Sequence, residues 1–319
     1  MTKFGYTGMG EQTDARSLIT NAVAAEEAGF DFAVFSDHFH PWLDEQGHSP
    51  FVWSVLGAVA DRTEQLQLMT MVTCPIIRYH PAIIAQAAAT VAILSDGRFT
   101  LGLGAGENLN EHVVGHGWPP ADVRQEMLDE AVELMLMLWR GGSQTWRGKY
   151  FTVQDARLYD LPEQPIPLSI AAGGSDAATL AARVGEGLIA TEPKAELVSQ
   201  YRSAGGSGPT YGQIPVCWAE DESTARKTAL QMWRFGVPGW KVMAELPSPV
   251  NFESATQTVR EDDVAELVAC GPDVAKFVDG VKEFVDAGFD HVAIVQAGPD
   301  QAGFLRFWEQ ELKGALTNL

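Results

Sequence analysis

Three features are scarce in this sequence: cysteine, positive charge and long apolar runs. Only Cys74, Cys217 and Cys270 occur in 319 residues, far apart and odd in number. This argues against a disulfide framework and against a closed zinc site. We therefore expect a chain that folds in a reducing compartment.

Basic residues are outnumbered by acidic ones. Lys and Arg total 22 against 42 Asp and Glu, for a formal net charge of −20 at pH 7. Such a surface repels phosphate at long range, which excludes a general nucleic-acid or anionic-membrane surface. No stretch approaches the roughly 20 apolar residues that cross a bilayer, and the first residues do not resemble a signal peptide. We expect a soluble, cytoplasmic protein with no nucleic-acid and no membrane partner.

Apolar side chains, by contrast, fill 46% of positions, enough for a large core. Short apolar runs alternate with longer amphipathic ones, such as residues 15–28 between a cap at Asp14 and a stop at Gly29. The eight predicted strands cover residues 3–7, 31–36, 65–73, 99–104, 167–172, 187–191, 213–218 and 291–296. Eight strand-then-helix units with right-handed crossovers predict an α/β fold, a (β/α)8 TIM barrel.

Two segments do not fit the repeat. Residues 143–160 alternate around Arg147, Gly148 and Lys149, which predicts a hairpin inserted after the fourth strand. Residues 235–262 contain three prolines and predict an excursion after the seventh strand and its helix, placed as a lid over the active site. No low-complexity linker divides the chain, so we expect one domain over residues 1–319.

The active site of such a barrel is expected where strands end. The exit of the second strand, Ser36–Trp42, holds an acid, two imidazoles and an indole. Asp37 and Trp42 alone would also suit a turn cap and a core plug. His38 and His40 favour a functional site, because imidazole exchanges protons near neutral pH.

Two further strand exits are rich in glycine. At the exit of the fourth strand, Gly104 and Gly106 precede Glu107. Two interpretations of these glycines stay open: they let the protein backbone approach a flat or phosphorylated ligand, or they only allow a strand to pack tightly against a helix. The further glycine and immediate helix of a dinucleotide fingerprint are absent. Gly173 and Gly174 stand before a helical pattern, where free backbone amides predict a site for a cofactor phosphate.

Metal-dependent hydrolysis is a rival interpretation of the histidines. His38 and His40 resemble the metal pair of barrel hydrolases, and His112 and His116 have the i, i+4 spacing of one helix face. Those enzymes also need an Asp or His at a late strand end. Asp300, the residue available there, is better explained as a helix cap, so we predict no metal.

Several of these segments together resemble the luciferase-like flavin and deazaflavin oxidoreductases, and among them the coenzyme F420-dependent glucose-6-phosphate dehydrogenases. The resemblance runs over nearly the whole chain. It is carried by motifs in register at Gly10–Gln12, Ser36–Trp42, Arg78–Ala82, Gly104–Glu111 and Ala171–Gly174. It implies a barrel that binds F420 and transfers a hydride, a two-electron chemistry that the deazaflavin supplies.

The resemblance also implies roles for matched positions. His38 and Glu107 would be the acid/base pair on opposite sides of the cofactor ring, with Trp42 and Glu11 shaping the substrate pocket. A cis peptide bond between Met71 and Val72 would form a bulge behind the ring. The other positions implied to line the deazaflavin and its phosphate are Asp37, Cys74, Ala105, Gly106, Asn110, Gly173, Gly174, Asp176 and Ala177.

The chain departs from these relatives where they grip the sugar phosphate with two lysines and an arginine. Of these three basic residues, only the first lysine is retained, as Lys194, near Thr191. Leu246 and Pro247 align with the second lysine of the relatives, and residues 264–267, Val-Ala-Glu-Leu, align with the region of their arginine. A phosphate dianion facing one lysine would bind poorly. We therefore predict that Thr191 and Lys194 bind a different hydroxylated or carbonyl substrate, apolar on its distal side.

The overall prediction is an enzyme, a coenzyme F420-dependent oxidoreductase acting on CH–OH or carbonyl groups of a small molecule. Two alternatives stay open: an FMN-dependent monooxygenase or reductase of the same superfamily, and a cofactor-binding protein without turnover. We also expect a homodimer, with the apolar helical pattern at residues 51–59 as a candidate interface.

Overall fold

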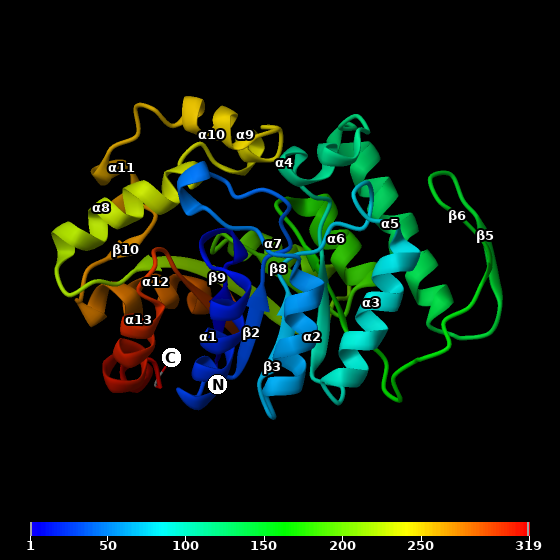
Figure 1. The fold of residues 1–319 in the computed structure, drawn as a ribbon, viewed down its shortest axis with the longest axis horizontal. Coiled ribbons are helices and arrows are strands. Elements are labelled where there is room, and N and C mark those ends of the chain that lie inside the picture. The colour runs from blue at the N-terminus through cyan, green and yellow to red at the C-terminus, as the bar shows by residue number, and fades with distance from the viewer. Residues whose placement is uncertain (1, 318) are drawn as a thin grey trace.

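The computed structural model describes residues 2–317 and 319 and contains a closed barrel of parallel strands (Figure 1). The ring runs β11-β1-β2-β3-β4-β7-β8, and β9 closes it by pairing with both β8 and β11. Its strands are β1 (Lys3–Gly8), β2 (Phe32–Phe35), β3 (Gln67–Thr70), β4 (Phe99–Leu103), β7 (Leu168–Ala171), β8 (Gly187–Ala190), β9 (Thr210–Cys217) and β11 (His291–Gln296). The predicted TIM barrel is confirmed, and each predicted strand is present.

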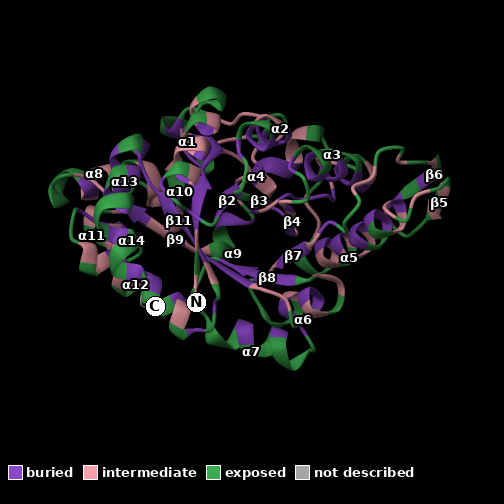
Figure 2. Cartoon of the chain, turned by 90° about the horizontal axis from the view of Figure 1, so that it is seen from below, coloured by how far each residue is buried: buried purple, intermediate pink, exposed green. Residues whose placement is uncertain are grey.

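Helices surround this ring, with buried faces inward and exposed faces outward (Figure 2). They are α1 (Ala15–Glu27), α2 (Val52–Arg62), α3 (Pro81–Leu94), α5 (Ala121–Leu138), α6 (Ser175–Val184), α7 (Ala195–Ser203), α8 (Glu222–Trp233), α12 (Val274–Asp286), α13 (Gln301–Phe307) and α14 (Lys313–Leu316), the last two joined by a π-helical turn, η5 (Trp308–Leu312). The predicted cap is present, since the Asp14 carboxylate accepts the N–H groups of Arg16 and Ser17. No helix within residues 2–317 is both long and apolar enough to span a bilayer.

Helix α2 corrects one prediction. Its apolar residues Val52, Trp53, Val55, Leu56 and Val59 are all buried in the main core. The pattern at residues 52–59 therefore reflects packing inside the barrel, and of the candidate interface at residues 51–59 only Phe51, 54% exposed, keeps an exposed large apolar side chain. A helix stripe that already faces the core has no apolar face left for a partner.

The hairpin predicted before the fifth barrel strand is present. Strands β5 (Gln144–Arg147) and β6 (Thr152–Ala156) pair antiparallel and extend beyond α5 at one side of the molecule (Figure 1). The Glu130 carboxylate of α5 accepts the backbone N–H groups of Lys149, Tyr150 and Phe151. Glu130, together with Glu126, which accepts from the side chains of Lys149 and Tyr150, holds the turn of the hairpin against the helix.

Residues 235–262, which we call the lid, lie above the carboxyl ends of the barrel strands (Figure 1). Short helices fill this segment and its flanks: η4 (Arg234–Gly236), α9 (Trp240–Met243), α10 (Pro249–Ala255) and α11 (Glu261–Ala265), followed by the short strand β10 (Ala269–Cys270) beside β9. An apolar group, the lid cluster, joins the lid to the strand exits; it consists of Met9, Trp42, Leu43, Leu109, Phe235, Met243, Phe252 and Val295. The short turns η1 (Gly10–Gln12), η2 (Asp44–Gln46), α4 (Asn108–Glu111) and η3 (His112–Val114) complete this end.

Candidate active site

His38 lies between two carboxylates at the barrel mouth. Its Nδ1 is 3.4 Å from Oε1 of Glu11, and its Nε2 is 3.8 Å from Oε1 of Glu107. The His38 and Glu11 side chains are 9% and 1% exposed. These three residues follow β2, β1 and β4, so closure of the barrel brings together groups that are far apart in the sequence.

The two ring nitrogens of His38 have different surroundings. Nδ1 also lies 3.2 Å from the carbonyl oxygen of His40. A proton on Nδ1 is therefore held by this carbonyl and by Glu11, an assignment that follows from the hydrogen-bond partners. Nε2 then keeps its lone pair and faces Glu107, which is the arrangement a proton acceptor needs. The 3.8 Å between Nε2 and Glu107 leaves no space for a flat ring between them, so the expectation that the two lie on opposite sides of the cofactor ring is wrong.

Glu11 is itself held by Ser36. The Ser36 hydroxyl donates to Oε2 of Glu11 at 2.5 Å and accepts the N–H of Gly10 at 3.0 Å. The sequence placed Ser36 in the motif at the second strand exit without a role of its own. Its hydroxyl links the exits of β1 and β2 and fixes the carboxylate that faces Nδ1 of His38.

Trp42 connects His38 to the lid. The two rings are 4.8 Å apart, and the indole stacks on Phe235 at 5.0 Å with an interplanar angle of 2°. Phe252 meets the same indole edge-on at 5.2 Å. Trp42 is buried in the lid cluster, so it is at once a packing residue and a neighbour of His38. Phe235 and Phe252 had no sequence signal beyond lying in the lid segment.

Asp37 is buried, with both carboxylate oxygens hydrogen-bonded. Oδ2 accepts from the Thr73 hydroxyl at 2.7 Å, and Oδ1 accepts from Arg78 Nη2 at 2.9 Å and from the Tyr79 hydroxyl at 3.0 Å. Burial and the neighbouring Asp37 raise the pKa of Tyr79 above its ordinary value. These protein contacts replace the turn-cap interpretation of Asp37. The motif at residues 78–82 contained Arg78 and Tyr79, but nothing in it indicated their partner.

Helix α4 holds the segment around His38 from the other side. Oδ1 of Asn110 accepts the N–H groups of Phe39 and His40 at 2.8 and 3.2 Å. Next to it, Glu111 is fully buried, and its Oε2 accepts the N–H of Arg78 at 2.7 Å. Burial raises the pKa of Glu111 to about 7, against the opposing effect of the Arg78 contact. Glu111 is a site residue that the sequence interpretation missed.

The positions predicted to line a flat ring also lie at this end. The predicted cis peptide bond between Met71 and Val72 is present. A Cβ on Gly104 would lie 2.7 Å from Cγ2 of Val72, so the absence of a side chain allows this close approach. Gly106 has φ +75 and packs against the buried Cys74 thiol. Burial raises the pKa of Cys74, and Glu111 and Glu107 raise it further, so this thiol stays protonated at neutral pH.

The start of α6 is open. Gly174 is its N-terminal cap residue, and no described side chain caps the helix. A Cβ on Gly174 would meet nothing within 4 Å, while the Trp240 indole of the lid lies 3.6 Å from where a Cβ on Gly173 would be. Backbone amides at such a helix start suit a phosphate. The predicted positions Gly173, Gly174, Asp176 and Ala177 therefore lie together.

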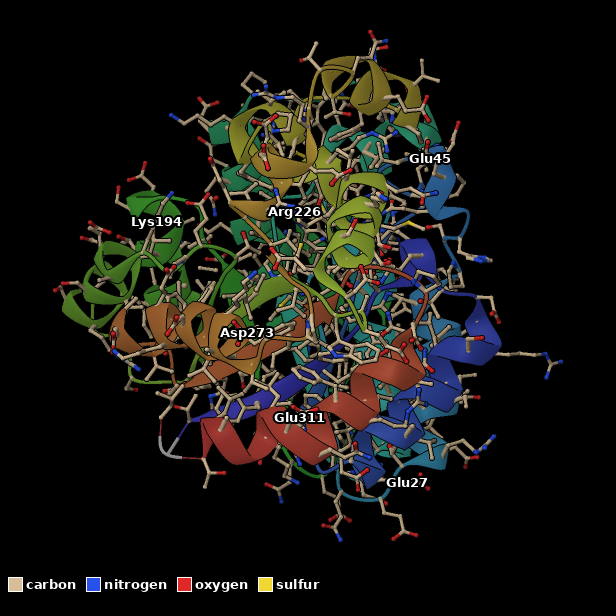
Figure 3. The ribbon with its side chains drawn as sticks, turned by 90° about the vertical axis from the view of Figure 1, so that its left-hand side faces the viewer. Glu27, Glu45, Lys194, Arg226, Asp273 and Glu311 are labelled. Carbon is tan, nitrogen blue, oxygen red and sulfur yellow. The ribbon has the colours of Figure 1, made fainter. Side chains whose placement is uncertain are left out.

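Thr191 and Lys194 follow β8. Both side chains are exposed, and Lys194 forms an ion pair with Glu192. Figure 3 shows Lys194 at the outer edge of the molecule, across the view from Glu45. The one lysine retained from the phosphosugar pattern is thus already paired with an acid.

His112 and His116, whose i, i+4 spacing the rival metal interpretation used, do not lie on one helix. His112 begins the short turn η3, and Gly115, at φ +84, ends it before His116. His112 instead lies beside His40, with ring centroids 6.3 Å apart. Burial and the nearby His112 lower the pKa of His40. Within the described part of the chain, no three His, Cys, Asp or Glu side chains are arranged to hold a metal ion.

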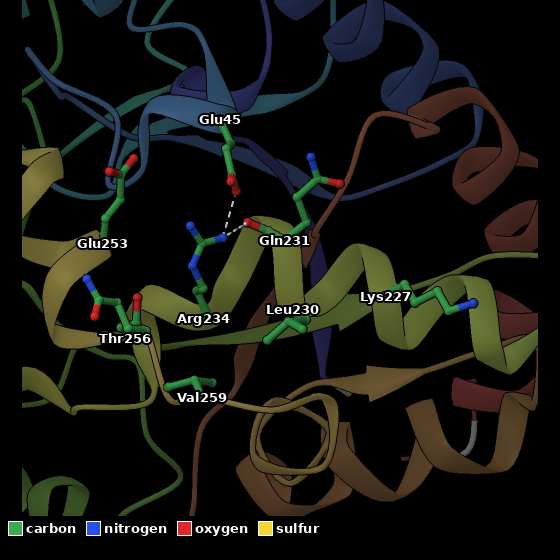
Figure 4. Close-up of a pocket in the computed structure, with 9 residues that line it drawn as sticks. Glu45, Lys227, Leu230, Gln231, Arg234, Glu253, Thr256 and Val259 are labelled. Carbon is green, nitrogen blue, oxygen red and sulfur yellow. Dashed lines mark hydrogen bonds and ion pairs between the residues drawn. The ribbon is translucent and has the colours of Figure 1, made fainter.

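A hollow of about 600 Å³ opens on the outer side of the lid, between α8, α10 and the turn η2 (Figure 4). Charged and polar side chains dominate its lining, among them Glu45, Lys227, Arg234 and Glu253. Nη1 of Arg234 donates to Oε2 of Glu45 at 2.7 Å, which ties η4, at the start of the lid, to the loop after β2. None of its lining residues is a predicted site residue.

Comparisons with known proteins agree with this geometry. The family model for luciferase-like monooxygenases matches residues 1–291. An F420-dependent glucose-6-phosphate dehydrogenase of Mycolicibacterium gilvum is 39% identical over 334 residues, covering 99% of this chain and 98% of that protein.

Solved structures extend the likeness to three dimensions. An F420-dependent secondary alcohol dehydrogenase in complex with an F420-acetone adduct superposes with a TM-score of 0.91 at 30% identity, covering 99% of both chains. The F420-dependent tetrahydromethanopterin reductase of Methanopyrus kandleri, at 20% identity and a TM-score of 0.77, shares the fold over 99% of both chains. The chain belongs to the luciferase-like monooxygenase family of (β/α)8 barrels.

Proposed function

We propose that this chain is a coenzyme F420-dependent oxidoreductase that transfers a hydride between the deazaflavin and a small alcohol or carbonyl compound. The observation that carries the proposal is His38 between Glu11 and Glu107, in a chain 39% identical to an F420-dependent dehydrogenase. Relatives that are 30% identical or more and named for F420 favour this cofactor over FMN. A proton acceptor at the mouth favours turnover over cofactor binding alone.

The residues present fit the cofactor. The uncapped start of α6 would hold its phosphate through the amides after Gly174, with Gly173, Asp176 and Ala177 beside it. The ring would lie over the Met71–Val72 bond, lined by Cys74, Ala105, Gly106, Asn110 and Asp37. When bound, the deazaflavin would accept or give up the hydride.

The proton would pass through His38. In alcohol oxidation, Nε2 takes the hydroxyl proton as the substrate carbon loses its hydride. Glu11 at Nδ1 and Glu107 near Nε2 stabilise the imidazolium that results. Both interactions gain strength because His38 and Glu11 are almost completely shielded from water. In carbonyl reduction the same imidazole returns the proton.

The substrate we propose is apolar on its distal side and is not glucose 6-phosphate. The Trp42 indole lies next to His38, and the buried rings of Phe235 and Phe252 pack against that indole, so the side of His38 that faces the lid is apolar. At the positions that the resemblance assigns to phosphate, Lys194 is paired with Glu192, and Leu246 packs against the lid cluster. We propose that Thr191 and Lys194 lie at the rim of this pocket.

Substrate-dependent bleaching of F420 tests this function. The purified protein is mixed with F420 and either 2-propanol, cyclohexanol or glucose 6-phosphate. We expect both secondary alcohols to bleach the cofactor, with kcat/KM at least about 100-fold above that for glucose 6-phosphate, a difference of about 3 kcal/mol. Bleaching by glucose 6-phosphate alone would overturn the substrate assignment, and no bleaching by any alcohol or sugar would overturn the function.

The assembly that we propose is a cytoplasmic homodimer of single-domain subunits. Helix α3 carries an exposed apolar stripe, with Ile83 58%, Ile93 40% and Leu94 46% exposed, and Phe51, at the start of α2, is 54% exposed. Such a stripe is typical of a subunit interface. The three cysteines are free thiols, which suits a reducing compartment. Sedimentation at the monomer mass would contradict the dimer.

A further inference from the structure

Arg78 lies between the two segments that surround His38. Its Nη2 donates to the carbonyl oxygen of Asp37 at 2.7 Å and to the Asp37 carboxylate at 2.9 Å. Its backbone N–H donates to Glu111 at 2.7 Å, and its Nε is 3.7 Å from the other Glu111 oxygen. The Arg78 and Glu111 side chains are 6% and 0% exposed. This buried arginine therefore joins the exit of β2 to helix α4.

Asp37 and His38 are neighbours whose side chains contact separate groups. The Asp37 carboxylate binds Thr73, Arg78 and Tyr79, whereas His38 faces Glu11, Glu107 and Trp42. Because Arg78 holds both the carbonyl and the carboxylate of Asp37, it fixes the backbone from which the imidazole projects. Both hydrogen bonds come from one guanidinium nitrogen, Nη2, which the rigid, planar group holds at a fixed place beside Asp37. A lysine ammonium is a point charge on a flexible stem and would not be held at that place in the same way.

Helix α4 supplies the matching restraint. Glu107, at its N-terminal end, faces Nε2 of His38, Asn110 accepts the N–H groups of Phe39 and His40, and Glu111 accepts the N–H of Arg78. The position of Glu107 relative to His38 thus depends on the same contacts that hold Arg78. The arginine charge also offsets two buried acids, Asp37 and Glu111.

We propose that Arg78, held by Glu111, is a positioning residue that sets where His38 lies between Glu11 and Glu107. It touches neither of the two carboxylates that flank His38 and acts only through Asp37 and α4. The consequence for turnover rests on the proposed function, but the placement of the imidazole does not. It can therefore be measured in the protein without cofactor.

Histidine-selective NMR of the cofactor-free protein tests the placement. The chain has seven histidines, and His38→Asn identifies the His38 signals by their loss. The key variant is Arg78→Lys, which keeps the charge and loses the planar fork. We expect the His38 ring signals to shift, while those of His291, which is paired with Asp290, stay in place.

Arg98→Lys is the matched control. Arg98 is also an arginine whose two terminal nitrogens donate to backbone carbonyls, those of Ala60, Thr63 and Leu66, just before β4 begins. We expect this variant to lower the midpoint of thermal unfolding and to leave the His38 signals unchanged. Unchanged His38 signals in Arg78→Lys, or equal shifts in both arginine variants, would overturn the proposal.

A second pair of variants does not depend on the stability of Arg78→Lys. Glu111→Gln keeps an oxygen that accepts the Arg78 N–H, whereas Glu111→Ala removes it. We expect the His38 signals of Glu111→Gln to resemble those of the unmodified protein, and those of Glu111→Ala to shift. Equal behaviour of the two Glu111 variants would contradict the proposal.

Turnover gives an independent measurement. With F420 and 2-propanol, we expect Arg78→Lys to lower kcat about 10- to 100-fold and to change the alcohol KM less than about 3-fold, because a small misplacement of a catalytic group costs rate more than binding. A raised KM with unchanged kcat would contradict a positioning role. If the unmodified protein bleaches no F420 while the NMR shifts are observed, the proposed function fails and the positioning of His38 stands.

Discussion

His38 has a carboxylate on each side and an indole against its ring, and it is nearly buried. We expect His38→Asn to lower kcat about 10²- to 10⁴-fold, the usual contribution of a general acid or base. F420 binding, measured by tryptophan fluorescence, should change little, because the asparagine still fills part of the site. His291→Asn is the control, since His291 lies at the start of β11, at the other end of the barrel. A kcat close to that of the unmodified protein would mean that another group carries the proton.

Glu111 makes stability depend on pH in an unusual direction. Burial raises its pKa from 4.5 to about 7, so the folded chain binds this proton more tightly than the unfolded chain. The free energy of unfolding should therefore fall as the pH rises from about 4.5 to about 7, by about 3 kcal/mol from this group.

Urea unfolding across that pH range measures the effect. Glu111→Gln cannot ionise and should flatten this part of the pH profile. Glu311→Gln, which removes an exposed acid on η5, should leave the profile as it is. A profile that is identical in the unmodified protein and in Glu111→Gln would contradict the assignment of a raised pKa.

At this scale the sequence predicted residue types better than contacts. His38, Glu107, Glu11 and Trp42 could be selected because strand exits concentrate chemistry in a barrel. Arg78 and Glu111 could not be selected, because their importance comes from burial beside Asp37, and burial of a charged side chain has no signature in a loop or a short helix. Ser36 is similar: its hydroxyl matters only because Glu11 lies next to it.

Among the elements, the loop after β2 is tied to helix α8, which leads into the lid, by one buried side chain, Gln46. Its Oε1 accepts the N–H groups of Trp42 and Leu43, and its Nε2 donates to the carbonyl oxygen of Met232 at the end of α8. Replacement by alanine would leave these three buried polar groups without their partner. We expect Gln46→Ala to cost about 1 to 3 kcal/mol of stability.

The same change should loosen the stack of Trp42 on Phe235, and so raise the KM for alcohols and shift the tryptophan emission to longer wavelength. Gln257→Ala serves as the control, because Gln257 is an exposed residue of the same lid. Should Gln46→Ala retain both the stability and the emission spectrum of the unmodified protein, the lid does not depend on this side chain.

The alternation of apolar runs predicted the barrel strands and the principal helices, since period and capping are local properties. It missed β10, whose two residues are too few for a pattern. The i, i+4 spacing of His112 and His116 was not evidence for a shared helix face either, because Gly115 in a left-handed conformation ends the turn between them. The apolar stripe of α2 was visible, but whether it faced the core or a second subunit depended on packing that no local pattern contains.

For the molecule as a whole, closure of the barrel brings residues that are distant in the sequence together into one site. The exits of β1, β2 and β4 meet at one end, so Glu11, His38 and Glu107 converge although they are spread over the first third of the chain. The sequence could indicate that these residues lie at the same end of the barrel, but it could not indicate that His38 would lie between two carboxylates. The contact between the loop after β2 and α8 could not be predicted either, since the hydrogen bond from Gln46 to Met232 joins residues 186 positions apart.

The measurement that tests the central claim most directly is a paired titration of the cofactor-free protein with F420 and with FMN, followed by tryptophan fluorescence. Trp42 lies beside His38 and should report a ring bound at the mouth. The account predicts saturable quenching by F420 with a Kd that is micromolar or tighter, corresponding to about −8 kcal/mol or better, and no comparable quenching by FMN. Tighter binding of FMN, or binding of neither cofactor, would contradict it.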